Sequence, residues 1–269
     1  MGYSFFKLAR IDAMRITGFI VSALRLRIIN HRNGLAWHML FLVFVLFISA
    51  AFGAQGKMAL FYEDFSSLDN WKPFTFPKIE KYTLYSIEHD GNRHVLKAES
   101  NASASAILYK NSFNVYEYPR ARWRWKVSNV YAGGDSRTKE GDDYPIRVYF
   151  MFEHDSGDAG VLERMQNSLL KTLYGEYPPH SSLSYVWANK EDNEKMVTSP
   201  YTERAKIIFL EQGVKKVGTW QDESVNIVAD YQKAFGIRPP RRARIAIMND
   251  SDNTGESSVS YMEYIEVLK

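Results

Sequence analysis

The chain has 269 residues, no cysteine, 45% apolar residues and 14% aromatic residues, so it can bury a full core without disulfides. Its formal charge of +3 is unevenly distributed, because residues 1–53 hold six of the 34 basic and one of the 31 acidic residues. The remainder carries 28 basic against 30 acidic residues. Nucleic-acid binding requires clustered positive charge on the folded domain, so we expect no nucleic-acid partner.

An uncharged apolar run at 35–54 dominates the first part of the chain. The basic residues before it are Arg25, Arg27 and Arg32. An apolar centre at Met39–Ile48 and the small-residue stretch Ala51-Phe52-Gly53 complete the order of a secretory signal peptide. We expect residues 1–56 to be a basic leader with an apolar helix, a signal peptide that is cleaved after Gly53. An uncleaved membrane anchor is one alternative, and a buried core helix is another.

Either form of the leader predicts export. With the basic N-terminus inside, residues 57–269 lie outside the cytoplasm, in the periplasm or anchored to the inner membrane. Residues 5–29 add a basic, apolar stretch. This stretch either lies on the membrane surface or precedes a true start at Met14.

Residues 57–269 read as a succession of short alternating segments with turn residues between them. In Ile146–Phe152, the even-numbered residues are apolar and face one way, and Arg147 and Tyr149 face the other. The sequence Asp90-Gly91-Asn92 predicts a hairpin turn. The other expected strands are Tyr82–Ile87, His94–Ala98, Ala104–Tyr109, Ala121–Val127, Leu183–Ala188, Ala205–Leu210, Arg244–Met248 and Val259–Val267.

This pattern of about ten strands predicts a mainly β fold, a single β-sandwich domain of jelly-roll or lectin-like type with one or two short helices. The expected helices are Ala159–Leu173, with apolar residues at helical spacing, and Glu223–Phe235, which ends at Gly236. In the second helix Asp222 is the expected cap and Glu223 lies in the first turn. The helix dipole would lower the pKa of Glu223, which does not suit a general acid.

The segment Trp123-Arg124-Trp125-Lys126 places both tryptophans on one face of a strand and the basic residues on the other. Exposed tryptophans would form a stacking platform for sugar rings. We interpret them instead as core residues, because large aromatic side chains dominate protein interiors. The basic row on the opposite face is then the candidate for binding.

The acidic turn before Ile146–Phe152 is a second candidate. It places Asp143 four residues before Arg147, on the same side as Tyr149 if the strand continues. A guanidinium, a carboxylate and a phenol on one surface suit recognition of a sugar hydroxyl or carboxylate. A structural ion pair beside the turn explains the same residues.

The segment Asn249–Gly255 is rich in oxygen ligands followed by glycine. Calcium bound by Asp250, Asp252 and Asn253 is one explanation. The segment does not match the twelve-residue calcium loop, however, because the twelfth residue counted from Asp250 is Tyr261 and that position requires glutamate. An Asx-rich turn between two strands is the interpretation we favour, so we expect no cofactor.

Several of these residues also resemble an uncharacterised bacterial family, domain of unknown function 3047, over roughly residues 60–268. The matching residues are Trp123–Lys126, Lys139–Asp143, Arg147–Tyr149, Tyr185–Trp187, Asn226, Asp230-Tyr231, Phe235-Gly236 and Asp250–Gly255. Val225 departs from the pattern, in which an arginine precedes Asn226. The resemblance implies envelope export and a lectin-like sandwich, without an established activity.

Three functions fit these observations. The first is a non-catalytic saccharide-binding module, favoured because no known catalytic motif is present. The second is a glycan-active hydrolase or lyase that uses Asp143 and Glu223 as its two carboxylates. The third is a structural or assembly protein of the envelope. The candidate site residues are Arg124, Asp143, Arg147, Tyr149, Trp187 and Glu223.

Overall fold

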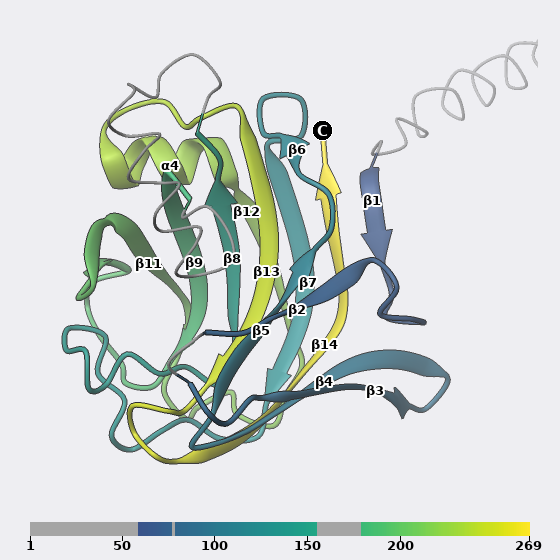
Figure 1. Ribbon diagram of the computed structural model, residues 1–269, viewed down its shortest axis with the longest axis vertical. Helices are drawn as coiled ribbons and strands as arrows, with labels where there is room; N and C mark the ends of the chain where they lie inside the picture. The colour runs from purple at the N-terminus through teal and green to yellow at the C-terminus, as the bar shows by residue number, and fades with distance from the viewer. Residues whose placement is uncertain (1–58, 77–78, 155–178) are drawn as a thin grey trace, which may run out of the picture. The chain divides into compact units, whose positions relative to one another are not determined.

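Two β-sheets and one helix make up the part of the protein that the computed structural model describes, residues 59–76, 79–154 and 179–269 (Figure 1). The leader and the expected helix Ala159–Leu173 lie outside these residues. Among the described residues, no helix has both the length and the apolar character that a membrane crossing needs. The fold is therefore a mainly β sandwich, as the alternating sequence pattern predicts.

Sheet A is antiparallel throughout its described pairings. Its strands follow the order β12-β7-β14-β4-β3, and β1 also pairs with β14. The strands are β1 (Ala59–Glu63), β3 (Leu84–Asp90), β4 (Arg93–Asn101), β7 (Arg120–Val127), β12 (Gln221–Asn226) and β14 (Ser257–Leu268). The longest of them, β14, lies at the centre of the sheet and pairs with β7 and β4 along its length.

Sheet B follows the order β10-β11-β9-β8-β13-β5-β2, with β6 paired to β13. Its strands are β2 (Trp71–Phe74), β5 (Ala104–Tyr109), β6 (Phe113-Asn114), β8 (Arg147–Phe152), β9 (Ser181–Ala188), β10 (Met196–Ser199), β11 (Thr202–Gln212) and β13 (Arg242–Asp250). Strands β9 and β11 are parallel neighbours. Strand β10 lies on the other side of β11 and pairs with it antiparallel. The sequence did not predict β1, β2, β6, β10 or β12.

The main core lies between the inner faces of the two sheets. Trp123 and Trp125 of β7 are fully buried, which confirms the interpretation of both tryptophans as core residues. Trp123 lies against Tyr185, and Trp125 lies against Trp187, with ring centroids 5.6 and 6.3 Å apart. Such offset aromatic contacts add to the stabilisation from burial alone. Even-numbered residues of β8 join this core, as the period of two predicts.

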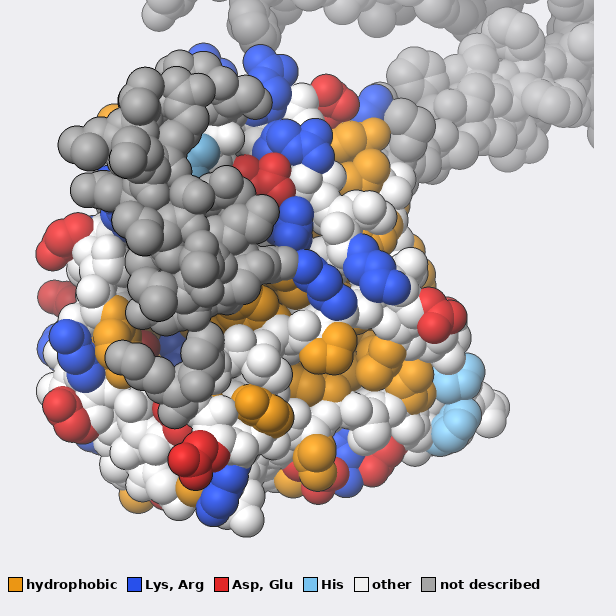
Figure 2. All heavy atoms as spheres, viewed as in Figure 1, with side chains coloured by type: hydrophobic (Ala, Val, Ile, Leu, Met, Phe, Trp, Pro, Cys, Tyr) orange, Lys and Arg blue, Asp and Glu red, His pale blue; other side chains and the backbone are white. Residues whose placement is uncertain are grey.

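The predicted hairpin is present as β3 and β4, with Asp90 opposite Arg93 across the turn. Gly91 has φ +64°, a conformation that glycine adopts without a steric penalty. His89 and His94 face each other across the strands, with ring centroids 4.7 Å apart. Figure 2 shows histidine side chains at the edge of the molecule, on the side where the hairpin of β3 and β4 projects in Figure 1.

The predicted helix Glu223–Phe235 is shorter than expected. Helix α4 spans Ile227–Phe235 and is capped by Asn226, whose side chain accepts a hydrogen bond from the Ala229 N–H at 3.0 Å. The residues before it form β12, because their backbone pairs with β7. Asp222 is therefore not the cap and Glu223 is not in a first turn. The helix ends at Gly236, as predicted, with φ +72°.

Candidate functional site

A hollow of about 670 Å³ opens at one end of the outer face of sheet A. Leu84, Glu99 and Val259 are cross-strand neighbours on β3, β4 and β14, and all three line it. The remaining lining residues are Lys81, Tyr82, Ser100, Asn101, Ser103, Ser128, Asn129, Ser257 and Ser258. Most of these side chains carry a hydroxyl or an amide. The hollow therefore offers many hydrogen-bonding groups and few charges.

Beneath the strands that line the hollow, buried hydroxyl groups form a network on the inner face of sheet A. The hydroxyls of Ser100 and Ser258 lie 2.9 and 2.6 Å from the Tyr131 hydroxyl. The Tyr131 and Ser258 hydroxyls also donate to Asn249 Oδ1, both at 3.1 Å, and Asn249 Nδ2 donates to the Ala98 carbonyl. Burial raises the pKa of Tyr131 above its ordinary value, so its hydroxyl stays protonated. This network links β4 and β14 of sheet A to Asn249 of β13 in sheet B.

The rim of the hollow is apolar and exposed. Tyr82 is 50% exposed and Leu84 is 68% exposed. An aromatic ring at the surface can stack on an apolar face of a ligand, while the hydroxyl and amide groups below can bond its polar edges. Lys81 and Glu99 supply one charge of each sign, and Glu99 is already paired with Lys97 at 3.1 Å.

The basic row of β7 lies on the same outer face, as the parity of Trp123–Lys126 predicts. Arg124 is paired with Glu263 at 3.3 Å and with Asp222 at 3.7 Å. The Lys126 ammonium lies between two aromatic rings, 4.7 Å from the Trp220 centroid and 4.8 Å from the Tyr261 centroid. Arg124 is thus the one sequence-predicted site residue that lies on this face.

Arg147 lies elsewhere, in what we term the buried arginine cluster: Arg147, Asp142 and Asp250. Its Nε donates to Asp250 Oδ1 at 2.8 Å, its Nη2 to Asp250 Oδ2 and to the Asp142 carbonyl, and its Nη1 to the Asp142 carboxylate at 3.4 Å. Arg147 is only 3% exposed. The expected partner Asp143 is not in contact with it, because β8 begins at Arg147 and strand parity does not extend back to residue 143.

Burial sets the protonation of the cluster. Burial raises the pKa of Asp250 to about 7, and the neighbouring Arg147 guanidinium limits that rise. Burial also raises the pKa of Asp142. The expectation of an accessible surface around Arg147 is wrong for these groups, because the guanidinium is enclosed and already engaged by two carboxylates. Tyr149 is half-buried beside it, its ring centroid 6.0 Å from the guanidinium carbon.

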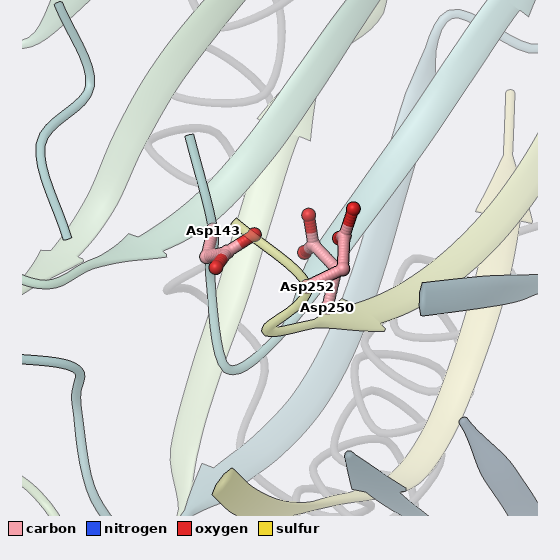
Figure 3. Close-up of side chains that lie close together, drawn as sticks. All are labelled: Asp143, Asp250 and Asp252. Atoms are coloured by element: carbon pink, nitrogen blue, oxygen red, sulfur yellow. The ribbon is translucent and has the colours of Figure 1, made fainter. Parts of the chain in front are cut away.

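Asp143, Asp250 and Asp252 bring carboxylate oxygens within 4.8 Å of one another (Figure 3). They come from two segments, the loop before β8 and the end of β13 with its following turn. The Asp143 oxygens accept hydrogen bonds from Asn253 Nδ2 at 3.1 Å and the Thr254 N–H at 2.6 Å. Asn253 thus turns its amide nitrogen, not its oxygen, toward this carboxylate. Since Arg147 supplies the positive charge at Asp250, the residues fit an Asx-rich turn better than a calcium site.

Glu223 lies on the inner side of β12, at the edge of sheet A, and accepts a hydrogen bond from the Trp125 indole at 3.1 Å. Burial and the nearby Glu211 carboxylate raise the pKa of Glu223 to about 7. The expected lowering by a helix dipole is therefore wrong, because Glu223 is in a strand. Glu211 itself is paired with Lys216 at 2.7 Å.

The six sequence-predicted residues do not share one surface. Trp187 is core, with its indole donating to the Gly213 carbonyl at 3.1 Å. Asp143, fully buried in a turn, and Glu223, beside Trp125 on β12, belong to different surroundings, so the structure does not pair them. The hollow was missed because its residues come from many strand ends. The concentration of Ser and Asn at 99–103, 128–129 and 257–258 was the available signal.

These features define a mainly antiparallel β-sandwich protein with a polar hollow on one sheet, lined in part by an exposed tyrosine. Within that class, the chain belongs to the family described as "Protein of unknown function (DUF3047)", whose profile matches residues 69–266. This confirms the resemblance drawn from the sequence. No curated protein matches the chain.

Several solved structures are similar at low sequence identity. The family 11 carbohydrate-binding module of Clostridium thermocellum Lic26A-Cel5E has 9% identity and a TM-score of 0.39, over 79% of this chain and 94% of that one. Trichoderma harzianum endoglucanase 3 of family GH12 has 8% identity and a TM-score of 0.41, over 80% and 99%. The Bauhinia forficata lectin has 10% identity and a TM-score of 0.37, over 77% and 96%.

Proposed function

We propose that the protein is a non-catalytic saccharide-binding module whose binding site is the hollow of sheet A. The observation that carries this proposal is the composition of the hollow, whose lining combines an exposed tyrosine with several residues that carry hydroxyl or amide groups. Sugars present apolar ring faces and polar edges, so an aromatic ring beside fixed hydrogen-bonding groups complements both. The buried hydrogen-bond network beneath the hollow keeps β4 and β14, which carry several of those groups, in place before a ligand arrives.

A glycan array followed by calorimetry on the full chain tests the proposal. Tyr82→Ala should remove most saccharide binding, because it deletes the stacking ring. The matched control is Tyr201→Ala, which removes a tyrosine of similar exposure outside the hollow and should leave binding unchanged. Equal affinity of the Tyr82→Ala variant and the unaltered protein, or no binding to any saccharide on the array, would refute the assignment.

A glycan-active enzyme is the second candidate, and Glu223 is the observation that favours it. A half-buried carboxyl with a pKa near 7 suits a general acid, and Glu211 is a second carboxylate close enough to influence it. The proposed pair is therefore Glu223 with Glu211, in place of Asp143. Release of reducing sugar from a glycan, abolished by Glu223→Gln, would support this candidate, whereas unchanged release would exclude Glu223 as the acid.

Export to the periplasm, or anchoring to the inner membrane, is proposed on the leader sequence alone. The order of arginines, apolar run and small residues at 25–53 supports it. Cell fractionation with a C-terminal tag tests it, and N-terminal sequencing of the exported form distinguishes cleavage after Gly53 from an anchor. Recovery of the tag in the cytoplasm would contradict export.

A further inference from the structure

Two histidines face each other near the tip of the hairpin that β3 and β4 form. The two-residue turn Gly91-Asn92 fixes the register of the strands, and His89 lies directly opposite His94. Side chains at directly opposed positions lie on the same face of a sheet, with their Cβ atoms about 4.5–5.5 Å apart. The backbone pairing of the hairpin therefore holds the two imidazoles side by side.

The arrangement of the two rings suits the chelation of one metal ion. Their centroids are 4.7 Å apart and their planes are inclined at 52°, so the rings are tilted and not stacked. An imidazole nitrogen binds zinc at about 2.0–2.1 Å. Because the ring centre lies roughly 1.2 Å behind that nitrogen, two rings that bind one ion at about 90–110° have their centres about 4.5–5.3 Å apart. The observed separation of the centroids lies within this window.

The imidazole pair is accessible from solvent. On the face of the hairpin that carries the histidines, Leu96 is buried, His94 is half-buried and His89 is exposed. The cover of the core thus ends before the tip, and Figure 2 shows histidine side chains at the surface on this side. Within the part of the chain that the structure describes, neither ring makes a hydrogen bond. An ion can therefore approach the rings and keep water in its remaining coordination positions.

The charges around the pair favour a cation. Asp64, in the loop after β1, is an exposed carboxylate whose pKa is lowered, mainly by hydrogen bonding to Ser66 and further by the charge of His94. This interaction places a negative charge near the imidazoles. Arg93 precedes His94 in the strand, so it points to the opposite face, where it pairs with Glu263 at 2.7 Å. Its positive charge is thus directed away from the histidines.

From this geometry we propose that His89 and His94 chelate one divalent transition-metal ion near the tip of the hairpin. Imidazole suits zinc, copper and nickel, whereas magnesium and calcium prefer oxygen ligands. A bound ion would join β3 to β4 beside their turn. The site is separate from the hollow, which Leu84 and Glu99 line at the other end of the same strands. The proposal therefore does not depend on saccharide binding.

Calorimetry of the tag-free full chain with zinc, copper and magnesium chlorides at pH 7.5 tests the site. We expect copper to bind more tightly than zinc, and magnesium not to compete with either. Binding should be lost at pH 5, because protons compete with the metal for the imidazole nitrogens. His89→Gln and His94→Gln should each lower the affinity for zinc at least about tenfold. His180→Gln, which removes a half-buried histidine just before β9, should leave it unchanged.

The double variant distinguishes a chelate from two independent side chains. In a chelate, either single substitution already destroys the site, so His89→Gln, His94→Gln and the double variant should lose the same affinity. Small losses that add up in the double variant, or a double variant that binds zinc as tightly as the unaltered protein, would overturn the proposal. Far-UV circular dichroism checks that the variants are folded.

Nuclear magnetic resonance on the unaltered protein provides the same test without a substitution. Adding zinc should shift the imidazole signals of His89 and His94 together, at one zinc concentration, because both rings bind the same ion. If both signals stay unchanged while other histidines respond, the assignment to the hairpin is wrong.

Discussion

The hollow and the buried arginine cluster are two polar regions of this protein, and they differ in where their hydrogen bonds go. In the cluster, Arg147 is enclosed and directs its donors to Asp250 and Asp142. In the hollow, hydroxyl, amide and ammonium groups reach an open concavity. The buried ion pairs around Arg147 are thus structural, and the proposed binding surface is the region of lower charge density.

Removing Arg147 should produce the largest effect and would test the structural role of the cluster. Arg147→Met leaves Asp250 and Asp142 buried without their counterion, so we expect a loss of about 3–5 kcal/mol in the free energy of unfolding. Urea denaturation at neutral pH measures it. Adding Asp250→Asn to Arg147→Met should restore part of the loss, because it removes the deepest uncompensated charge. A loss below about 1 kcal/mol would mean that the pair is not structural.

Glu223 is an intermediate case, half-buried and without a directly paired cation among the described residues. Its pKa in the folded state is about 7 against 4.5 for a free side chain, so the folded protein binds the proton more tightly than the unfolded chain. Stability should therefore fall as pH rises from about 4.5 to 7. Glu223→Gln should stabilise the protein by about 1–2 kcal/mol at pH 8, allowing for partial solvent screening.

The control for Glu223→Gln is the same pair of proteins at pH 4, where both side chains are neutral. There the two free energies of unfolding should agree. Thermal unfolding followed by circular dichroism between pH 4 and 8 gives the whole profile. A difference that is constant with pH would show that packing, not ionisation, distinguishes the variant.

Tyr82→Ala should have the smallest effect on stability and would sharpen the contrast with the cluster. The ring is half exposed and has no hydrogen-bonding partner among the described residues, so the free energy of unfolding should change by less than about 0.5 kcal/mol. Ligand binding should nevertheless be lost. Urea denaturation beside calorimetry separates the two effects, and a large loss of stability would mean that Tyr82 is part of the fold's framework.

The strands with strong alternation were predictable from the sequence, and the weaker ones were not. For β5 and β7, the apolar pattern and the turn residues both indicate where the strand begins and ends. The ranges expected from the sequence therefore agree with the observed strands to within one residue. Four residues of β12, Glu223–Asn226, fall inside the expected helix Glu223–Phe235, because Asp222 has the residue type of a helix cap. Only its pairing with β7 makes it a strand, and a long-range pairing is not encoded in local propensity.

The site was harder to predict than the fold for a related reason. Parity correctly placed Arg124 outward and Trp123 inward, because both are within one regular strand. It failed for Asp143, which lies in the loop before β8. The hollow combines residues separated by up to 178 positions, from Lys81 to Val259. Such a surface depends on strand order, which the sequence pattern does not reveal.

The pairing of β1 with the end of β14 has a consequence for how the hollow is presented. Ala59 lies opposite Leu268, whereas the hollow is lined by Ser257–Val259 at the other end of β14. Ten residues of extended strand span about 33 Å. The chain thus enters the sandwich at one end of β14, and the proposed binding site lies at the other end. An attachment at Ala59 would therefore begin about 33 Å along the strand from the hollow.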